Sequence, residues 1–192
     1  MIRTKNITGI ILAGGKSSRM GTDKGLLEIN QKPFVMHIAD ALQPLVSEIM
    51  IVSDNSKYDV FGYRRILDVF KDSGPLDGVY SGLKASKTEY NLVLSCDIPL
   101  IKTIVLKQLI DSIDATNDVF QIESNGKTMP LVALYKKTCS RTFQELLINH
   151  EKRLQFAVNQ CKVKNIKLKH RYDQTITNVN TKQEFKLLNY EH

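Results

Sequence analysis

The most chemically distinctive stretch of the chain is a glycine-rich, basic segment near its start. The apolar run 10–13 is followed directly by the pair Gly14-Gly15. Lys16, Arg19 and Lys24 then place three cations within nine residues. Glycines let backbone N–H groups approach a ligand closely, and Lys and Arg neutralise phosphate oxygens. The segment is therefore a candidate binding site for the triphosphate of a nucleotide.

Two familiar phosphate-binding patterns do not describe this segment. The P-loop motif is Gly-x-x-x-x-Gly-Lys-Ser/Thr, in which the sixth residue is a glycine. In this chain the sixth residue counted from Gly14 is Arg19, and counted from Gly15 it is Met20. The Gly-x-Gly-x-x-Gly pattern of dinucleotide-binding proteins is also missing here.

Carboxylates at the ends of two later apolar runs could complete such a site. Asp97 follows the run 90–96, and one carboxylate with waters and phosphate oxygens is enough for Mg²⁺. Its simpler role would be to cap the turn or helix that follows. Asp68 ends the run 64–68, where a carboxylate could accept hydrogen bonds from a base or a ribose.

The elements that position these residues alternate along the chain. Hydrophobic patterns predict strands at 10–13, 26–29, 48–52, 64–68, 90–96, 118–122, 130–135 and 163–168, and helices at 33–46, 75–85, 102–114, 138–148, 152–160 and 181–189. Asn125-Gly126 is typical of a hairpin turn, and Thr181 with Glu184 of a helix-capping box. The alternation predicts a three-layer α/β/α sandwich with a mostly parallel sheet.

Ligands bind such sheets at the carboxyl ends of the strands. The predicted ends carry the unusual residues of the chain: 14–24, Ser53, 68–78 and Asp97. The candidate residues are therefore expected to meet at one edge of the sheet.

Residues 12–24 read Leu-Ala-Gly-Gly-x-Ser-x-Arg-Met-Gly-x-x-Lys, which closely resembles the signature of the MobA-like molybdenum cofactor guanylyltransferases, a family of nucleotidyltransferases. The segments 74–78, 96–99, 130–135 and 178–181 also resemble family segments, so the resemblance runs nearly end to end. It implies a Rossmann-like sheet of the nucleotide-diphospho-sugar transferase (GT-A-like) type. The length of 192 residues independently favours a single domain spanning 1–192.

The resemblance also implies roles for individual residues. It assigns catalysis to Lys24, Arg19 and Asp97, and a metal ion to Asp97 and Asn180. It assigns the acceptor to Asn178, Asn180 and Arg153. The implied nucleotide-binding residues are Leu12, Ala13, Gly14, Gly15, Lys24, Ser53, Asp68 and Asp97.

The implied reaction is transfer of GMP from GTP to molybdopterin, with Mg²⁺ as cofactor and molybdoenzyme maturation proteins as further partners. Guanine is not specified by the loop itself. Cytidylyl transfer to molybdopterin, nucleotidyl transfer to a sugar phosphate, and nucleotide binding without turnover remain alternatives.

The composition of the chain limits the kinds of ligand, partner and cellular location that we expect. The net charge of +7 favours an anionic ligand, but no aromatic platform or motif for nucleic acid accompanies it. No apolar run approaches twenty residues and the N-terminus lacks a signal-peptide pattern, so we expect a cytoplasmic protein without a membrane partner. The three distant cysteines favour reduced thiols, with Cys96 buried, and the histidines lack zinc-ligand spacing.

Overall fold

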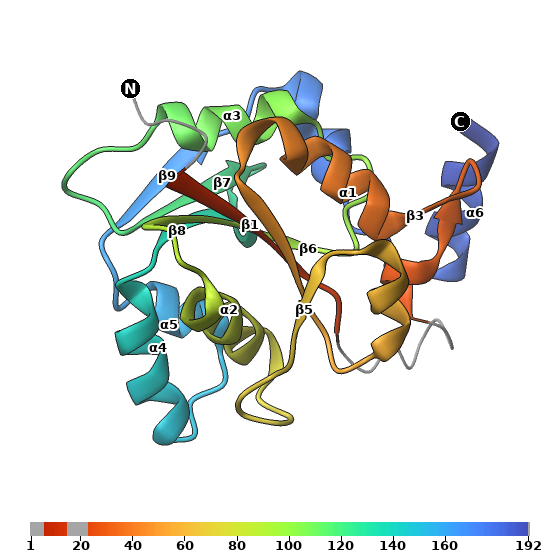
Figure 1. Cartoon of the computed structure of the whole chain (residues 1–192). Helices are drawn as coiled ribbons and strands as arrows, with labels where there is room; N and C mark the ends of the chain where they lie inside the picture. The colour runs from red at the N-terminus through yellow and green to blue at the C-terminus, as the bar shows by residue number, and fades with distance from the viewer. Residues whose placement is uncertain (1–5, 15–22, 192) are drawn as a thin grey trace.

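The computed structural model describes residues 6–14 and 23–191 (Figure 1). Its main sheet contains β1 (Ile7–Leu12), β4 (Glu48–Val52), β5 (Arg64–Ile66), β6 (Tyr90–Ser95), β7 (Val119–Ser124), β8 (Lys127–Lys136) and β9 (Val163–Lys167). The strands β2 (Glu28–Ile29) and β3 (Lys32–Pro33) form a separate hairpin. The helices are α1 (Phe34–Leu42), α2 (Gly74–Ala85), α3 (Thr103–Asp111), α4 (Cys139–Ile148), α5 (Leu154–Val158) and α6 (Lys182–Glu191).

Strand β1 lies inside the sheet, which has the order β5-β4-β1-β6-β8-β7-β9. All six of its residues are buried. Ile7 and Ile11 belong to the apolar cluster on one face, and Ile10 and Leu12 to the cluster on the other. This is the two-residue alternation of a strand covered on both sides, and it explains why the run is apolar without interruption.

Helices cover both faces of the sheet, as Figure 1 shows. Helices α1 and α3 contribute to the first apolar cluster, while α2, α4 and α5 contribute to the second. The predicted three-layer α/β/α sandwich is therefore confirmed. Within the described ranges, no helix is long and apolar enough to cross a membrane.

The sheet is mostly parallel, as predicted. Strand β1 pairs in parallel with β4 and β6, β4 with β5, and β7 with β9, whereas β8 runs antiparallel to β6 and β7. The turn between β7 and β8 contains Asn125 at φ 51° and Gly126 at φ 73°. Two positive φ values are what a two-residue hairpin turn needs, which confirms this turn.

The segment after the glycine-rich loop differs from its prediction. Lys24–Leu26 forms a short 3₁₀ helix, η2, and only Glu28–Ile29 of the expected strand 26–29 is extended. Pro33 lies in β3 rather than in the first turn of α1, with an extended ψ of 146°. Helix α1 ends at Leu42 instead of residue 46, because Pro44 has no N–H to continue it.

Two further 3₁₀ helices were not predicted: η4 (Ser56–Phe61) and η5 (His170–Ile176). A 3₁₀ helix of this length is too short to show a repeating pattern of hydrophobic residues, so the sequence pattern does not predict it. Helix η4 contributes a buried tyrosine, Tyr58, to the core beside η2.

The packing of α2 on β1 gives a first testable prediction. A β-carbon on Gly82 would lie 2.7 Å from Ile10 Cγ2 and 3.0 Å from Ile10 Cδ1, in a core without room for it. We expect Gly82→Ala to lower the free energy of unfolding by about 1–3 kcal/mol.

Gly78→Ala in the same helix is the matched control. Its β-carbon would make only ordinary contact with Leu12, at 3.4 Å, so the helix propensity of alanine should leave stability unchanged or higher. Urea unfolding of both variants measures the difference, and equal midpoints would contradict the close packing at Gly82.

Candidate functional site

The strands β1, β4, β5 and β6 end at the same edge of the sheet, and a cavity of about 660 Å³ opens there. Its described lining comprises Leu12, Gly14, Val52, Asp54, Asp68, Asp72, Ser73, Gly74, Pro75, Gly78, Ser95 and Leu131. Leu12, Gly14 and Asp68 were predicted to bind a nucleotide, and the structure brings them together in this cavity.

Acidic side chains line one side of this cavity. Asp54 follows β4, Asp68 follows β5, and Asp72 precedes α2. Burial, and then the nearby charges of Asp77 and Asp54, raise the pKa of Asp68 to about 6. Asp68 is therefore ionised at neutral pH and can accept hydrogen bonds from hydroxyl or N–H groups of a ligand.

A second group of candidate residues meets just after the end of β6, the strand whose Ser95 lines this cavity. Lys24 Nζ lies 2.5 Å from Asn180 Oδ1, to which it donates a hydrogen bond, and 3.7 Å from Asp97 Oδ2. The side chains of Lys24 and Asp97 are 18% and 15% exposed, so solvent and ligands reach them only in part. Three segments far apart in the sequence thus form one cluster, which we call the Lys24–Asp97–Asn180 cluster.

The backbone around Asn180 is tied to the end of β6. Val179 N donates to the carbonyl of Asp97 at 2.8 Å, and the Val179 side chain is buried. Glu184 accepts hydrogen bonds from Asn180 N at 2.7 Å and Thr181 N at 2.9 Å. Glu184 N donates to Thr181 Oγ1 at 3.1 Å, which confirms the predicted capping box and fixes Asn180 at the start of α6.

Asp97 and Asn180 offer two oxygen donors that could hold a metal ion. Asp97 Oδ1 is buried and has no hydrogen-bond partner among the described residues, which is costly for a carboxylate unless a cation binds it. Across residues 6–14 and 23–191 no set of three His, Cys, Asp or Glu side chains could hold a metal ion. A site with one carboxylate and one amide oxygen suits Mg²⁺, because that ion takes its other ligands from water and phosphate.

Other predicted residues lie differently. Ala13 and Ser53 are buried, and the Ser53 hydroxyl accepts a hydrogen bond from Asn55 N at 3.1 Å rather than lining the cavity. Their roles at a ligand would have to come from the backbone. Gly15 and Arg19, together with Lys16, lie outside the described residues.

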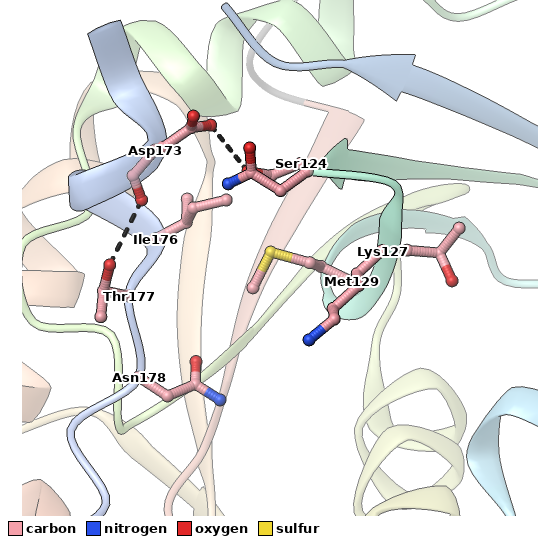
Figure 2. A pocket seen from close by; sticks show the side chains of 9 residues that line it. Ser124, Lys127, Met129, Asp173, Ile176, Thr177 and Asn178 are labelled. Atoms are coloured by element: carbon pink, nitrogen blue, oxygen red, sulfur yellow. Dashed lines mark hydrogen bonds between the residues drawn. The ribbon is translucent and has the colours of Figure 1, made fainter. Parts of the chain in front are cut away.

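The predicted acceptor residues do not all lie together. Asn178 lines a second cavity of about 460 Å³, shown in Figure 2 with Lys127, Met129 and Asp173. Arg153 is not among the described lining residues of either cavity. Its guanidinium instead pairs with Glu151 at 2.6 Å and stacks on the ring of Phe156, so its acceptor role stays a prediction.

Several residues of the site escaped the sequence analysis. Asp54 lines the cavity, and Asp23 accepts hydrogen bonds from Tyr58 and Asn55 directly beside Lys24. A strand-end position could have suggested Asp54, as it did Asp68. The contact between Asp23 and Tyr58 spans 35 residues and carries no local sequence signal.

Cys96 is buried at the end of β6, as predicted. Its burial, followed by the neighbouring charge of Asp97, raises the pKa of the thiol. A thiol that stays protonated is a poor nucleophile and a poor metal ligand, so Cys96 serves packing.

Sequence relatives cover almost the whole chain. A protein of Flavobacterium johnsoniae named "probable molybdenum cofactor guanylyltransferase" is 35% identical over 96% of this chain and 97% of its own length. The molybdenum cofactor guanylyltransferase of Shewanella loihica is 34% identical, over 82% of this chain and 84% of its own length.

Solved structures share the fold. Molybdopterin-guanine dinucleotide biosynthesis protein A of Archaeoglobus fulgidus superposes with a TM-score of 0.81 at 18% identity, covering 96% of this chain and 97% of that one. The 4-diphosphocytidyl-2C-methyl-D-erythritol synthase of Anaerococcus prevotii gives 0.76 at 14% identity, covering 98% and 96%. At these identities the likeness shows that the fold is shared, and no more.

The family model of the MobA-like NTP transferase domain matches residues 9–163, which include the glycine-rich loop, Lys24, the acidic cavity and Asp97. With this match and a relative that is 35% identical over nearly the full length, the chain belongs to the MobA-like NTP transferase family.

Proposed function

We propose that this protein transfers GMP from GTP to the phosphate of molybdopterin, giving molybdopterin guanine dinucleotide and pyrophosphate. The observation that carries the proposal is the Lys24–Asp97–Asn180 cluster, which lies, like the acid-lined cavity, at the carboxyl ends of the strands. A cation next to a free carboxylate oxygen is what a magnesium-bound triphosphate requires. The names of the relatives support guanine and molybdopterin as the substrates.

The cavity is the proposed site of the guanosine moiety. A guanine base offers N–H donors and a ribose offers hydroxyl donors, and the carboxylate of Asp68 accepts from either. The cavity lining includes Leu12, Gly14 and Gly78, which have small or apolar side chains. They leave space in the cavity for a base and a sugar.

The reaction is a substitution at the α-phosphate. An oxygen of the acceptor phosphate forms a bond to the α-phosphorus, the bond from that phosphorus to the bridging oxygen breaks, and pyrophosphate leaves with the electron pair. The acceptor is already anionic and needs no strong general base, so alignment and charge neutralisation are the main tasks. Lys24 supplies a compact positive charge for this purpose.

Asp97 and Asn180 are the residues that would hold Mg²⁺. When bound, the ion would neutralise phosphate charge as a Lewis acid. The Lys24 ammonium contacts Asn180 Oδ1 and Asp97 Oδ2 in this structure, whereas Asp97 Oδ1 has no hydrogen-bond partner among the described residues.

The acceptor is proposed to lie on the side of Asn178. Asn178 and Asn180 flank the buried Val179, and Asn178 lines the second cavity (Figure 2). This arrangement supports an acceptor that reaches from that cavity to the α-phosphate at the cluster. The proposal includes a cytoplasmic setting and delivery of the product to molybdoenzyme maturation proteins.

The raised pKa of Asp68 predicts how GTP binding depends on pH. The ionised carboxylate accepts hydrogen bonds, and with a pKa of about 6 it becomes mostly protonated as the pH falls below that value. Between about pH 7.5 and about pH 5.5, we expect loss of the ionised form to weaken GTP binding about fourfold.

The control for this prediction is Asp68→Asn, which cannot titrate. The γ-phosphate of GTP also gains a proton in this range, but it does so equally with both proteins. Isothermal titration at both pH values isolates the part due to Asp68. The same pH dependence in both proteins would remove Asp68 from nucleotide binding.

The nucleotide preference itself is tested by isothermal titration with GTP and CTP in the presence of Mg²⁺. The proposal predicts tighter binding of GTP. Tighter binding of CTP would replace it by cytidylyl transfer, and binding of neither would reject a nucleotidyltransferase role.

A further inference from the structure

The carboxylate of Asp23, the residue before Lys24, is held by three hydrogen bonds. Asp23 Oδ1 accepts from Gly25 N at 3.2 Å and from the hydroxyl of Tyr58 at 2.5 Å. Asp23 Oδ2 accepts from Asn55 Nδ2 at 3.0 Å. Both carboxylate oxygens of Asp23 therefore accept hydrogen bonds. Asp23 is also the residue that caps the N-terminus of η2, so these bonds hold the start of that turn in place.

Tyr58 is suited to be a permanent donor in this arrangement. Its side chain is completely buried, and its ring packs against Phe61 with a centroid distance of 6.1 Å. Burial, together with the hydrogen bond to the Asp23 carboxylate, raises the pKa of Tyr58 above its usual range, so the hydroxyl keeps its proton. A buried hydroxyl group that donates no hydrogen bond would lower the stability of the fold. The hydroxyl of Tyr58 avoids this cost by donating to Asp23.

Gly25 completes the fit between η2 and Tyr58. A β-carbon on Gly25 would collide with the Tyr58 hydroxyl, and it would lie 3.1 Å from Tyr58 Cζ. Only glycine therefore lets the backbone after Lys24 pass this close to the tyrosine.

The two side-chain donors to Asp23 come from the segment that follows β4. Asn55 Oδ1 accepts from Lys57 N at 3.1 Å and so caps η4, while its amide nitrogen reaches Asp23. The Ser53 hydroxyl in turn accepts from Asn55 N. The exit of a core strand is thus connected by hydrogen bonds to the turn that carries Lys24.

We infer that Tyr58 is a positioning residue for Lys24: through the carboxylate of Asp23, its hydroxyl holds η2 so that the Lys24 ammonium faces Asp97 and Asn180. The inference rests on the proposed function in one respect, namely that Lys24 contacts the phosphates of the bound nucleotide. Tyr58 itself touches no substrate; it acts only through Asp23 and the turn.

A double-mutant cycle tests this inference. Tyr58→Phe, Lys24→Ala and the double variant are compared with the unchanged protein by the affinity for GTP, measured with a fluorescent GTP analogue in Mg²⁺. We expect Tyr58→Phe to weaken binding about five- to tenfold when Lys24 is present, and less than about twofold in the Lys24→Ala background. Equal losses in both backgrounds would overturn the inference.

Two further variants separate positioning from folding. Tyr135 is also completely buried, and its hydroxyl donates to the Pro130 carbonyl at 2.7 Å, so Tyr135→Phe is the matched control and should leave nucleotide affinity unchanged. If Tyr58→Phe unfolds, Asp23→Asn replaces it, because an amide has only one acceptor oxygen and its NH2 group must then face either the Asn55 Nδ2 donor or the Gly25 N donor. A loss of the same size in Tyr135→Phe would assign the effect to stability alone and overturn the inference.

The failure of this inference and the failure of the proposed function give different results. If the unchanged protein binds no nucleoside triphosphate, the proposed function fails. If it binds one and the cycle is additive, the nucleotide site stands and Tyr58 loses its positioning role.

Discussion

Lys24→Ala is expected to lower kcat for nucleotidyl transfer by about a hundredfold to a thousandfold, the usual effect of removing one preorganised charge or donor from a transition state. Lys24 is the cation of the described cluster, at 3.7 Å from Asp97 and 2.5 Å from Asn180. Its loss leaves the charge that develops around the α-phosphate without this neutralisation. The release of pyrophosphate, followed with a coupled assay, measures the effect.

The control for this variant is Lys32→Ala. Lys32 is a neighbouring lysine of the β2–β3 hairpin, and its ammonium pairs with Asp40 at the surface. Surface ion pairs contribute little to stability, so this change should leave kcat and the thermal midpoint nearly unaltered. An activity of Lys24→Ala within about twofold of the unchanged protein would contradict the role given to Lys24.

Asp97→Asn is expected to lower kcat by about a hundredfold or more and, separately, to weaken the binding of Mn²⁺, used as a probe for Mg²⁺. The change keeps the size of the side chain but removes the charge from the buried oxygen, Oδ1, that has no partner among the described residues. Electron paramagnetic resonance of Mn²⁺ in the presence of GTP measures metal affinity without relying on turnover.

An exposed aspartate provides the comparison for this second variant. Asp111 lies at the solvent-exposed end of α3, and Asp111→Asn should change neither metal affinity nor kcat. If Asp97→Asn binds Mn²⁺ as tightly as the unchanged protein does, the metal ion is held elsewhere. Loss of activity without loss of metal affinity would then point to a role of Asp97 in holding Lys24.

The sequence predicted the layers of this fold because its strands are short apolar runs and its helices have a clear apolar face. The run around Ile10 shows this well, since burial on both faces of a central strand demands uninterrupted apolar residues. The edge where ligands bind followed from the parallel strand order. That inference placed Asp68 and Asp97 at the same edge of the sheet.

The parts that could not be predicted depend on contacts across long stretches of chain. The turn η2 is held by hydrogen bonds from Tyr58 and Asn55 to Asp23, more than thirty residues away along the chain, whereas the local pattern of residues 26–29 predicts a strand. Arg153, by contrast, is a residue for which the sequence suggested a role that the structure does not show. Its position in the sequence suggested a substrate contact, but an ion pair with Glu151 accounts for its side chain in this structure.

Asn178 and Asn180 illustrate how packing refines a motif. Val179 between them is buried and bonded to the backbone of Asp97, which turns both amides away from the core. Asn180 reaches Lys24, whereas Asn178 lines the second cavity. The motif alone suggests two similar ligands, and the structure gives them different neighbours.

The central claim is that this protein is a guanylyltransferase acting on molybdopterin. The most direct measurement is pyrophosphate release by the unchanged protein with molybdopterin and Mg²⁺, in parallel reactions with GTP and with CTP. We expect release of pyrophosphate with GTP that depends on molybdopterin, and a kcat/KM for CTP that is lower than that for GTP by at least about tenfold. A higher kcat/KM with CTP, or binding of GTP without any pyrophosphate release, would contradict it.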